Sequence, residues 1–288
     1  MNLRAPPLGV VLLLIAMLCS GGSAAAQVPN SVFVEDLTWT ELRDLVKSGK
    51  TTVIIPVGGV EQSGPYMALG KHDVRVRSLS ETIARNLGNA LVAPVVAYVP
   101  EGDFDPPTEH MRFPGTISVS TSAFREILSD AARSFQAHGF RDVVLIGDHG
   151  GYQSDLKQVA DQLNRAWEKT PARAHYIGAY YSATQVAYVA ALRARGYSMA
   201  EIGSHAGLAD TSLMLAVDPR LVRTERLRSG AAPPGPALGV MGDPRRSTAA
   251  LGQLGVREIV RETTQAIQSD IQNSRATPRR IVSPARTP

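Results

Sequence analysis

Apolar and polar positions follow two different periods along this chain, and the two kinds of segment alternate. Residues 52–57 and 142–146 are apolar runs rich in β-branched side chains, a pattern typical of strands buried on both faces of a sheet. Residues 91–99 and 174–181 have the same strand-like character. The other periodic segments place apolar residues at helical spacing, which predicts helices at residues 38–49, 74–87, 122–138, 152–167, 183–195, 208–217 and 257–271.

This alternation of strands and helices predicts the fold class. Consecutive strands separated by helices favour a parallel sheet, because parallel neighbours need a long crossover connection. We therefore expect a single-domain, three-layer α/β/α fold with a largely parallel central sheet, extending over residues 30–272. Gly139 is expected to end the helix that precedes the strand at residues 142–146.

The first 26 residues have the layout of a secretory signal peptide. Arg4 precedes an apolar run, and small residues end at Ala26, so cleavage is expected before Gln27. An uncleaved membrane anchor is the alternative, but the apolar run is shorter than the roughly 20 residues that span a bilayer. The pattern predicts an exported protein, periplasmic or secreted, without a stable membrane anchor after processing.

Charge and cysteine content narrow the possible partners. Much of the net charge of +4 comes from the Arg-rich stretch 220–228 and from residues 273–288. The second of these segments, residues 273–288, is predicted to form a disordered basic tail. Nucleic-acid surfaces usually interleave basic with aromatic side chains, so no nucleic-acid partner is expected. The only cysteine, Cys19, lies in the predicted signal peptide. A metal site in the mature chain must therefore use His and carboxylate ligands.

Histidines and carboxylates occur together in the loops that follow the predicted strands. Such loops meet at the carboxyl edge of a parallel sheet, where ligands usually bind. Imidazole and carboxylate groups are ligands for Zn²⁺ and Mn²⁺, and a bound ion can activate water against an amide. The candidates, in chain order, are Glu61 and His72, Glu109 and His110, Asp148 and His149, and His205 and Asp210.

Each candidate also has a structural interpretation. His72 and Asp73 fit a surface ion pair, Asp148 and Asp210 fit helix caps, and Lys71 is expected to be a solvated loop charge. What favours a site is that three separate loops each carry a histidine with a carboxylate, in addition to the segment with Glu109 and His110. The chain also lacks the G-x-S-x-G, Walker A and G-x-G-x-x-G motifs, which removes the usual signals for serine hydrolysis and nucleotide binding.

Five segments carry a resemblance to a known family. In order, from about residue 37 to about residue 255, they are PVGGVEQSGPYMALGKHD, EHMRFPGTISV, IGDHGGYQ, GSHAGLADTS and GVMGDPRRSTAALG. These segments resemble the landmarks of the creatininase family. The resemblance implies a creatininase-like α/β fold and a divalent metal centre of Zn²⁺, Mn²⁺ or Fe²⁺ with one or two ions. It also implies a homo-oligomer, often a hexamer, that hydrolyses cyclic or linear amides.

The resemblance extends to individual positions. Glu61 and His149 match metal-binding residues of the family, and His205 matches its catalytic histidine. Ser63 stands where the family has a further metal-binding His, and His72 stands where it has an Asp that bridges two metals. The other differences are Gly151 in place of a metal-binding Glu, Asp148 in place of a Gly, and Tyr152 in place of an Asn.

These differences favour one well-formed metal over two, because a neutral imidazole offers one lone pair and cannot bridge two ions. The expected metal ligands are Glu61, His72, His149 and Asp210. His205 and Asp210 are the expected catalytic residues, with His205 moving a proton or stabilising the tetrahedral oxyanion. The residues expected to support the metal or contact the substrate are Ser63, Asp73, Glu109, His110, Asp148 and Tyr152.

The functional hypothesis is an exported, metal-dependent amidohydrolase that cleaves a C–N bond of a small-molecule amide with a metal-activated water. A close variant is hydrolysis of an ester or C–C bond on a ring. The alternative from another class is a periplasmic binding or scaffold protein that retains the fold without turnover. The loss of two family ligands favours that alternative, and metal content separates the two.

Overall fold

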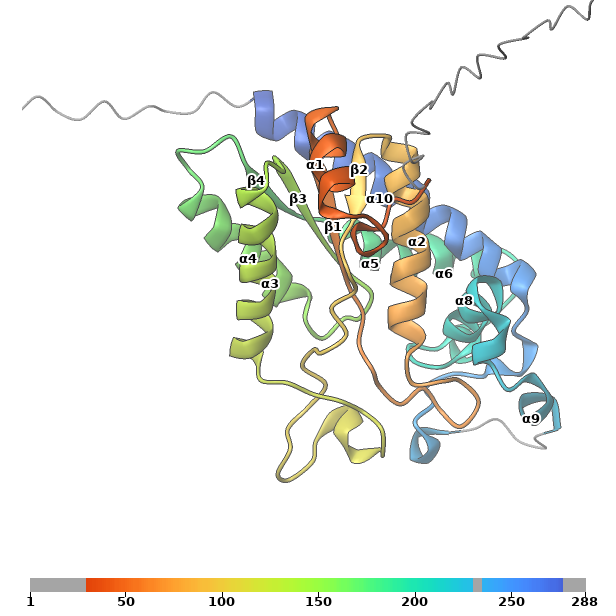
Figure 1. The fold of residues 1–288 in the computed structure, drawn as a ribbon. Coiled ribbons are helices and arrows are strands. Elements are labelled where there is room, and N and C mark those ends of the chain that lie inside the picture. Colours follow the sequence, from red (N-terminus) through yellow and green to blue (C-terminus); the bar gives the residue numbers. More distant parts are fainter. Residues whose placement is uncertain (1–29, 230–234, 277–288) are drawn as a thin grey trace, which may run out of the picture.

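The computed structural model describes residues 30–229 and 235–276 (Figure 1). The predicted signal peptide and residues 277–288 lie outside the described residues. Within the described part, four strands form one sheet in the order β2-β1-β3-β4, and each neighbouring pair is parallel. The strands are β1 (Thr52–Val57), β2 (Ala90–Val92), β3 (Asp142–Gly147) and β4 (Arg173–Tyr176).

Helices cover both faces of this sheet. Alternate side chains of β1 and β3 point to opposite faces, so Ile54 and Val144 enter one core while Val53 and Val143 enter the other. The predicted α/β fold with a parallel sheet is confirmed, and Figure 1 shows α3 and α4 on one side with α2, α8 and α10 on the other. The first core is closed by α2 (Lys71–Leu87), α5 (Ala179–Gln185), α6 (Ala187–Arg193), α8 (Leu208–Val217) and α10 (Ala249–Ala276). The second is closed by α1 (Trp39–Lys47), α3 (Thr121–Ala137) and α4 (Gln153–Ala166).

Local signals fix several helix ends. The Thr38 side chain accepts a hydrogen bond from the Glu41 backbone in a capping box, which starts α1. Gly139 follows α3 with φ +98°, a left-handed conformation that glycine adopts without steric cost. The remaining short helices are α7 (Met199–Ile202), α9 (Thr224–Ser229) and the 3₁₀ turns Val34–Asp36, Glu109–Arg112, Pro219–Leu221, Pro236–Leu238 and Pro244–Arg246.

Three predicted boundaries were wrong. β2 ends at Val92 instead of residue 99, and beyond Pro94, which has no N–H to donate, only Val96 bridges to β1. β4 ends at residue 176, and α5 begins where a strand was predicted. The predicted helix at residues 183–195 is two helices, separated at Val186, whose φ of −112° and ψ of −70° depart from helical values.

Two further differences concern the ends of long helices. α2 begins at Lys71 and not at residue 74, so its first turn carries three ionisable side chains toward the carboxyl edge of the sheet. α10 continues to Ala276, so residues 273–276, predicted as part of the tail, are helical, and Arg275 pairs with Asp142 at 2.6 Å. Among the described helices, none combines the length and apolarity needed to cross a membrane.

Candidate metal centre

The carboxyl ends of β1 and β3 open onto a cluster of ionisable side chains. Glu61 lies in the loop after β1, and His149 lies in the loop after β3. The first turn of α2 brings Lys71 and His72 to the same place. Four of the six histidines of the chain contribute to this cluster. Its other members come from more distant segments and are Glu101, His110 in a 3₁₀ turn, His205, and Asp210 in the first turn of α8.

One group within this cluster has the geometry of a metal site. Donor atoms of Glu61, Glu101, His110 and His149 all lie within 4.8 Å of one another, and we call these four residues the metal-type group. Glu61 Oε2 is 3.0 Å from His110 Nε2 and 3.5 Å from His149 Nε2. Bonds from zinc to nitrogen and oxygen of about 2.0–2.2 Å place neighbouring ligand atoms roughly 3 Å apart. Two of these contacts are near that spacing, and all four side chains converge on one place, as the ligands of a divalent ion do.

Buried oxygens without hydrogen bonds point to the same place. Glu61 and Glu101 are almost completely buried. Glu61 Oε2 and both Glu101 carboxylate oxygens have no hydrogen-bond partner in the described part of the chain. Leaving such oxygens unpaired is costly, and protein interiors rarely do so without an ion or water as partner. A divalent cation would satisfy these oxygens together with both imidazoles, so the residues present fit such an ion.

The protonation states agree with metal binding by imidazole. Burial lowers the pKa of His149 to about 4 and that of His205 to about 3, so both rings are neutral near pH 7. Burial, followed by the negative charge of Glu61, raises the pKa of Glu101 to about 8. Without a cation Glu101 is thus mostly neutral near pH 7 beside the Glu61 carboxylate, and a divalent cation would favour ionisation of both groups. Neutral imidazole is the form that binds metal.

His72 has a different role from His149. Its Nδ1 lies 2.6 Å from Asp148 Oδ2, and its Nε2 lies 2.7 Å from Glu61 Oε1. Burial and the Lys71 charge oppose protonation of His72, but Glu61 and Asp148 outweigh them and raise its pKa. A protonated ring that donates to a carboxylate from each nitrogen has no lone pair left for a metal. His72 therefore connects the loops after β1 and β3 as a hydrogen-bond donor.

Asp210 is neutralised by two basic side chains. Lys71 Nζ lies 3.2 Å from Asp210 Oδ2, and the Arg75 guanidinium lies 2.9 Å from Asp210 Oδ1. The Ala206 backbone N–H also donates to this carboxylate at 3.0 Å. Burial opposes ionisation, but the charges of Lys71 and Arg75 hold the pKa of Asp210 well below its usual value. Asp210 is thus an ionised partner for two cations.

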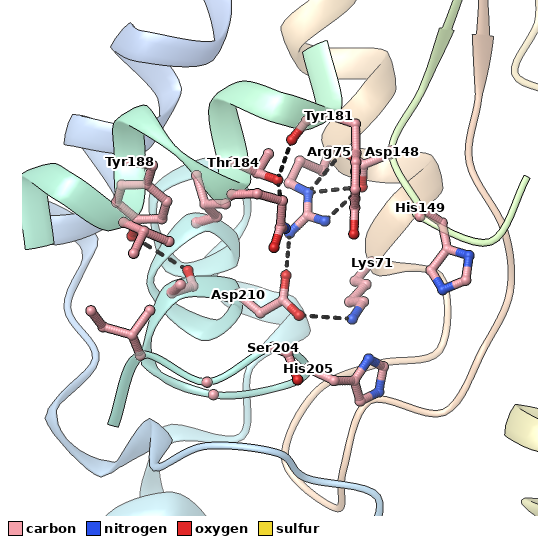
Figure 2. Close-up of a pocket in the computed structure, with 18 of the residues that line it drawn as sticks. Lys71, Arg75, Asp148, His149, Tyr181, Thr184, Tyr188, Ser204, His205 and Asp210 are labelled. Atoms are coloured by element: carbon pink, nitrogen blue, oxygen red, sulfur yellow. Dashed lines mark hydrogen bonds and ion pairs between the residues drawn. The ribbon is translucent and has the colours of Figure 1, made fainter. Parts of the chain in front are cut away.

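A cavity of about 110 Å³ adjoins the cluster. Figure 2 shows Lys71 between His149 and His205 at one end of it, with dashed lines from Asp210 to Lys71 and Arg75. The opposite wall is made of neutral residues that include Tyr181, Thr184 and Tyr188. The cavity can therefore hold a small polar group next to two neutral imidazoles and one ammonium.

Comparison with known proteins identifies the family. A family profile described as creatinine amidohydrolase matches residues 35–267. The chain belongs to the creatininase family. Relatives include the mycofactocin precursor peptide peptidase of Mycobacterium tuberculosis (strain ATCC 25618 / H37Rv), 30% identical over 72% of this chain and 80% of that protein. Another is the creatinine amidohydrolase of Pseudomonas putida, 28% identical over 69% of this chain and 76% of that protein.

Solved creatininases share the fold. A manganese form aligns with a TM-score of 0.69 and a mutant of the Zn-Zn type with 0.68. Each is 25% identical and covers 83% of this chain and 98% of its own chain. The creatininase-like fold expected from the sequence motifs is confirmed. Members of this family are metal-dependent amidohydrolases, and the candidate metal centre lies at the carboxyl edge of the shared sheet.

Among the ligands expected from the family motifs, two occupy the metal-type group and two do not. Glu61 and His149 are members of it, whereas His72 and Asp210 are not. Both exceptions have a physical reason, since the two nitrogens of His72 face carboxylates and both oxygens of Asp210 face cations. His110, expected only as a supporting residue, supplies a donor atom instead.

Glu101 and Lys71 were missed by the sequence reasoning. Glu101 follows the strand-like run at residues 91–99, so the rule that selected the other post-strand loops also applies to it. It has no histidine beside it, and for that reason it was not singled out. Lys71, expected to be a solvated loop charge, is fully buried, because α2 starts there and directs its side chain inward.

The other expected residues lie around the cluster in supporting positions. Asp73 Oδ1 accepts a hydrogen bond from the Gly59 N–H at 2.8 Å. Asp148 bonds to His72, and the Tyr152 hydroxyl lies 2.6 Å from the Gly58 carbonyl oxygen. Ser63 is buried, and its hydroxyl has no partner among the described residues. Glu109 is exposed and lies outside the metal-type group.

Proposed function

We propose that this protein is a metal-dependent hydrolase that cleaves an amide C–N bond of a small polar molecule. The observation that carries the proposal is the convergence of unpaired, buried oxygens of Glu61 and Glu101 with two imidazoles. In this proposal Glu61, Glu101, His110 and His149 hold one divalent cation, with Mn²⁺ and Zn²⁺ as the first candidates. Such an ion would lower the pKa of a water molecule and polarise the amide carbonyl.

His205 is the residue proposed to move protons. Its Nδ1 lies 3.6 Å from Glu61 Oε1, and its ring lines the cavity. His205 Nε2 lies 3.0 Å from the Gln62 backbone carbonyl oxygen, which can accept its N–H, orient the ring and leave Nδ1 free. The neutral ring can pass a proton from the attacking water on to the leaving nitrogen without remaining protonated, because its pKa of about 3 disfavours the charged form. The water oxygen joins the carbonyl carbon, the C–N bond breaks, and the products are a carboxylic acid and an amine.

The cavity limits which part of a substrate enters. A volume of about 110 Å³ has room for only a few heavy atoms, and its walls are mostly polar. This supports a small amide or cyclic amide as substrate. A second candidate is removal of a terminal residue from a short peptide, supported by the relative named a precursor peptide peptidase. In that case the terminal residue would occupy the cavity and the remaining peptide would stay outside.

Metal content tests the proposal against a scaffold that binds no metal. The protein, purified and dialysed against Mn²⁺ or Zn²⁺, is expected to retain one ion per chain by elemental analysis. His149→Ala is expected to lower the metal affinity at least tenfold. His138→Ala is the matched control, because His138 is exposed and lies in the loop after α3. Equal metal content in the two variants, or none in the wild type, would contradict the proposal.

Activity then decides between the substrate classes. The metal-loaded protein is assayed against lactams, hydantoins, formamides and short peptides, with the chelator-treated protein as control. Release of an amine from a small cyclic or linear amide supports the first candidate, and release of a terminal amino acid supports the second. A metal-loaded protein that cleaves none of these compounds would leave the binding or scaffold alternative as the better account.

We also propose that the protein works outside the cytoplasm and assembles into a homo-oligomer. The signal-peptide layout of residues 1–26 supports the first statement. The second rests on membership of the creatininase family and is tested by light scattering of the purified protein.

A further inference from the structure

Lys71 is an unusual residue in this site, because a fully buried lysine needs a specific reason. Its Nζ lies 3.3 Å from Glu61 Oε1 and 3.2 Å from Asp210 Oδ2. The buried carboxylate of Glu61 and the partly exposed one of Asp210 thus share one ammonium. Lys71 is also the first residue of α2, so its backbone position is set by the helix and not by a mobile loop.

The two oxygens of Glu61 have separate partners. Oε2 faces the metal-type group, 3.0 Å from His110 Nε2, and accepts no hydrogen bond. Oε1 faces Lys71 Nζ and His72 Nε2, at 3.3 and 2.7 Å. Glu61 is therefore positioned to bridge two positive charges. The first would be the metal ion of the proposed function, and the second is the ammonium of Lys71.

The Oε1 side of Glu61 is unsuited to a divalent ion of its own. The carboxylates on that side belong to Glu61, Asp148 and Asp210. They are already surrounded by three basic side chains, Lys71, His72 and Arg75, each of which contacts one or two of them. In the described residues, the only group with converging metal donors is the one on the Oε2 side. An ion placed beside the Lys71 ammonium would also meet direct charge repulsion at about 3 Å.

We propose that the Lys71 ammonium takes the place of a second metal ion, so that the centre consists of one divalent cation and one fixed protein cation. This inference rests on the proposed function and adds the stoichiometry of the site and a role for Lys71. Lys71 lines the cavity beside His149 and His205. There its charge would stabilise the carbonyl oxygen of an amide bound in the cavity, where negative charge develops during hydrolysis.

Titration with Mn²⁺ tests this inference without a substrate. The wild-type protein is expected to bind one Mn²⁺ per chain and to show the electron paramagnetic resonance spectrum of an isolated ion. In Lys71→Ala, Glu61 Oε1 and Asp210 Oδ2 lose their shared cation. We therefore expect a second, weaker Mn²⁺ to bind there, seen as a stoichiometry of two and a spin-coupled spectrum at millimolar Mn²⁺.

Two further variants complete the test. Lys71→Gln keeps most of the side-chain volume and an oxygen that can bind metal, so it takes the place of Lys71→Ala if the latter fails to fold. Lys50→Ala is the matched control, because Lys50 Nζ bonds to the Gly88 carbonyl oxygen far from the site, and it should behave as wild type. Circular dichroism checks the fold of each variant.

The outcomes separate this inference from the proposed function. Two Mn²⁺ ions with a coupled spectrum in the wild type would overturn the role of Lys71 while supporting a metal enzyme. A stoichiometry that stays at one in a folded Lys71 variant would also overturn it. A wild-type protein that binds no Mn²⁺ would overturn the proposed function and this inference together.

Discussion

At the scale of single residues, burial decides how each ionisable group of this site behaves. Glu101 and His149 both lose water, but burial raises the pKa of the acid and lowers the pKa of the base, so both shift toward their neutral forms. Glu61 remains ionised, because the charges of Lys71 and His72 outweigh the cost of its burial and lower its pKa. Glu61 is therefore charged, whereas Glu101 and His149 a few ångströms away favour their neutral forms. A metal centre with a separate proton carrier requires such differences in charge between neighbouring groups.

Replacement of Glu101 by Gln tests the ligand that the sequence analysis missed. Glu101→Gln keeps the shape of the side chain but removes its charge, so we expect the affinity for Zn²⁺ to fall at least tenfold. Competition with a chromophoric chelator measures this affinity. Glu109→Gln, which changes an exposed neighbour, should leave it unchanged. A Glu101→Gln variant with wild-type affinity would remove Glu101 from the ligand set.

At the scale of secondary-structure elements, hydrogen bonds between loops hold the site together. Tyr152, at the start of α4, is fully buried, and its hydroxyl lies 2.6 Å from the Gly58 carbonyl oxygen in the loop after β1. The Tyr152 hydroxyl oxygen also accepts a hydrogen bond from the His149 backbone N–H at 3.1 Å. Tyr152 therefore connects the loop after β1, which carries Glu61, with the loop after β3, which carries His149.

We expect Tyr152→Phe to lower the free energy of unfolding by about 1–3 kcal/mol, because it leaves buried backbone groups without a partner. Urea denaturation measures the change. Tyr98→Phe is the control, since Tyr98 is exposed, and its effect should be within about 0.5 kcal/mol. Equal effects from both variants would mean that the Tyr152 hydroxyl does not stabilise the loops.

A contact between β4, β3 and α10, away from the metal centre, predicts that the stability of the protein depends on pH. His175 on β4 lies 2.6 Å from Asp270 on α10 and 3.1 Å from Asp142 on β3, and Arg275 also reaches Asp142. Burial opposes the charged form of His175, but the hydrogen bonds that its ring donates to Asp142 and Asp270 raise its pKa. The stability from this contact is fully present below about pH 6.5, the pKa of an unfolded histidine, and is lost as pH rises through the raised folded-state pKa.

Asp270→Asn should reveal this dependence. We expect the variant to be less stable than wild type at pH 5.5 by about 1 kcal/mol, a modest value because Asp270 is partly exposed. The difference in melting temperature should shrink as pH approaches 9. Asp161→Asn, which alters an exposed helix pair, should show no such trend. A difference that stays constant with pH would contradict the proposed titration of His175.

At the scale of the whole molecule, the parallel sheet explains why one edge carries the chemistry. All four strands point the same way, so the loops that leave their carboxyl ends meet on one side. Figure 1 shows the long loops after β1 and β2 together at the lower edge of the sheet. A hydrolase site at this edge is compatible with both faces of the sheet being covered by helices.

Export is a prediction about the whole chain. Expression of the full-length chain in a Gram-negative host should place the mature protein outside the cytoplasm, and intact-mass spectrometry should find Gln27 as its first residue. Replacement of an apolar residue in the run by a charge, as in Leu13→Arg, should retain the precursor in the cytoplasm. A mature product that still carries residues 1–26 would instead support the uncleaved anchor.

Much of this protein follows from local sequence patterns. Apolar runs such as residues 52–57 and 142–146 predict the buried strands. The alternation of strands with helices predicts that the sheet is parallel. The same logic places Glu61 and His149 at one edge, because it depends only on strand direction. The wrong boundaries of β2 and of the helix at residues 183–195 also have local causes, because Pro94 and Val186 interrupt elements that periodicity alone would continue.

Side-chain partners across distant loops depend on three-dimensional packing. Whether an imidazole such as His72 binds a metal or donates to two carboxylates is settled by groups 11 and 76 positions away in the chain. The burial of Lys71 and the approach of Glu101 have the same origin. Periodicity reports which face of an element is apolar, whereas electrostatic interactions depend on distances between atoms, and those exist only once the chain has folded.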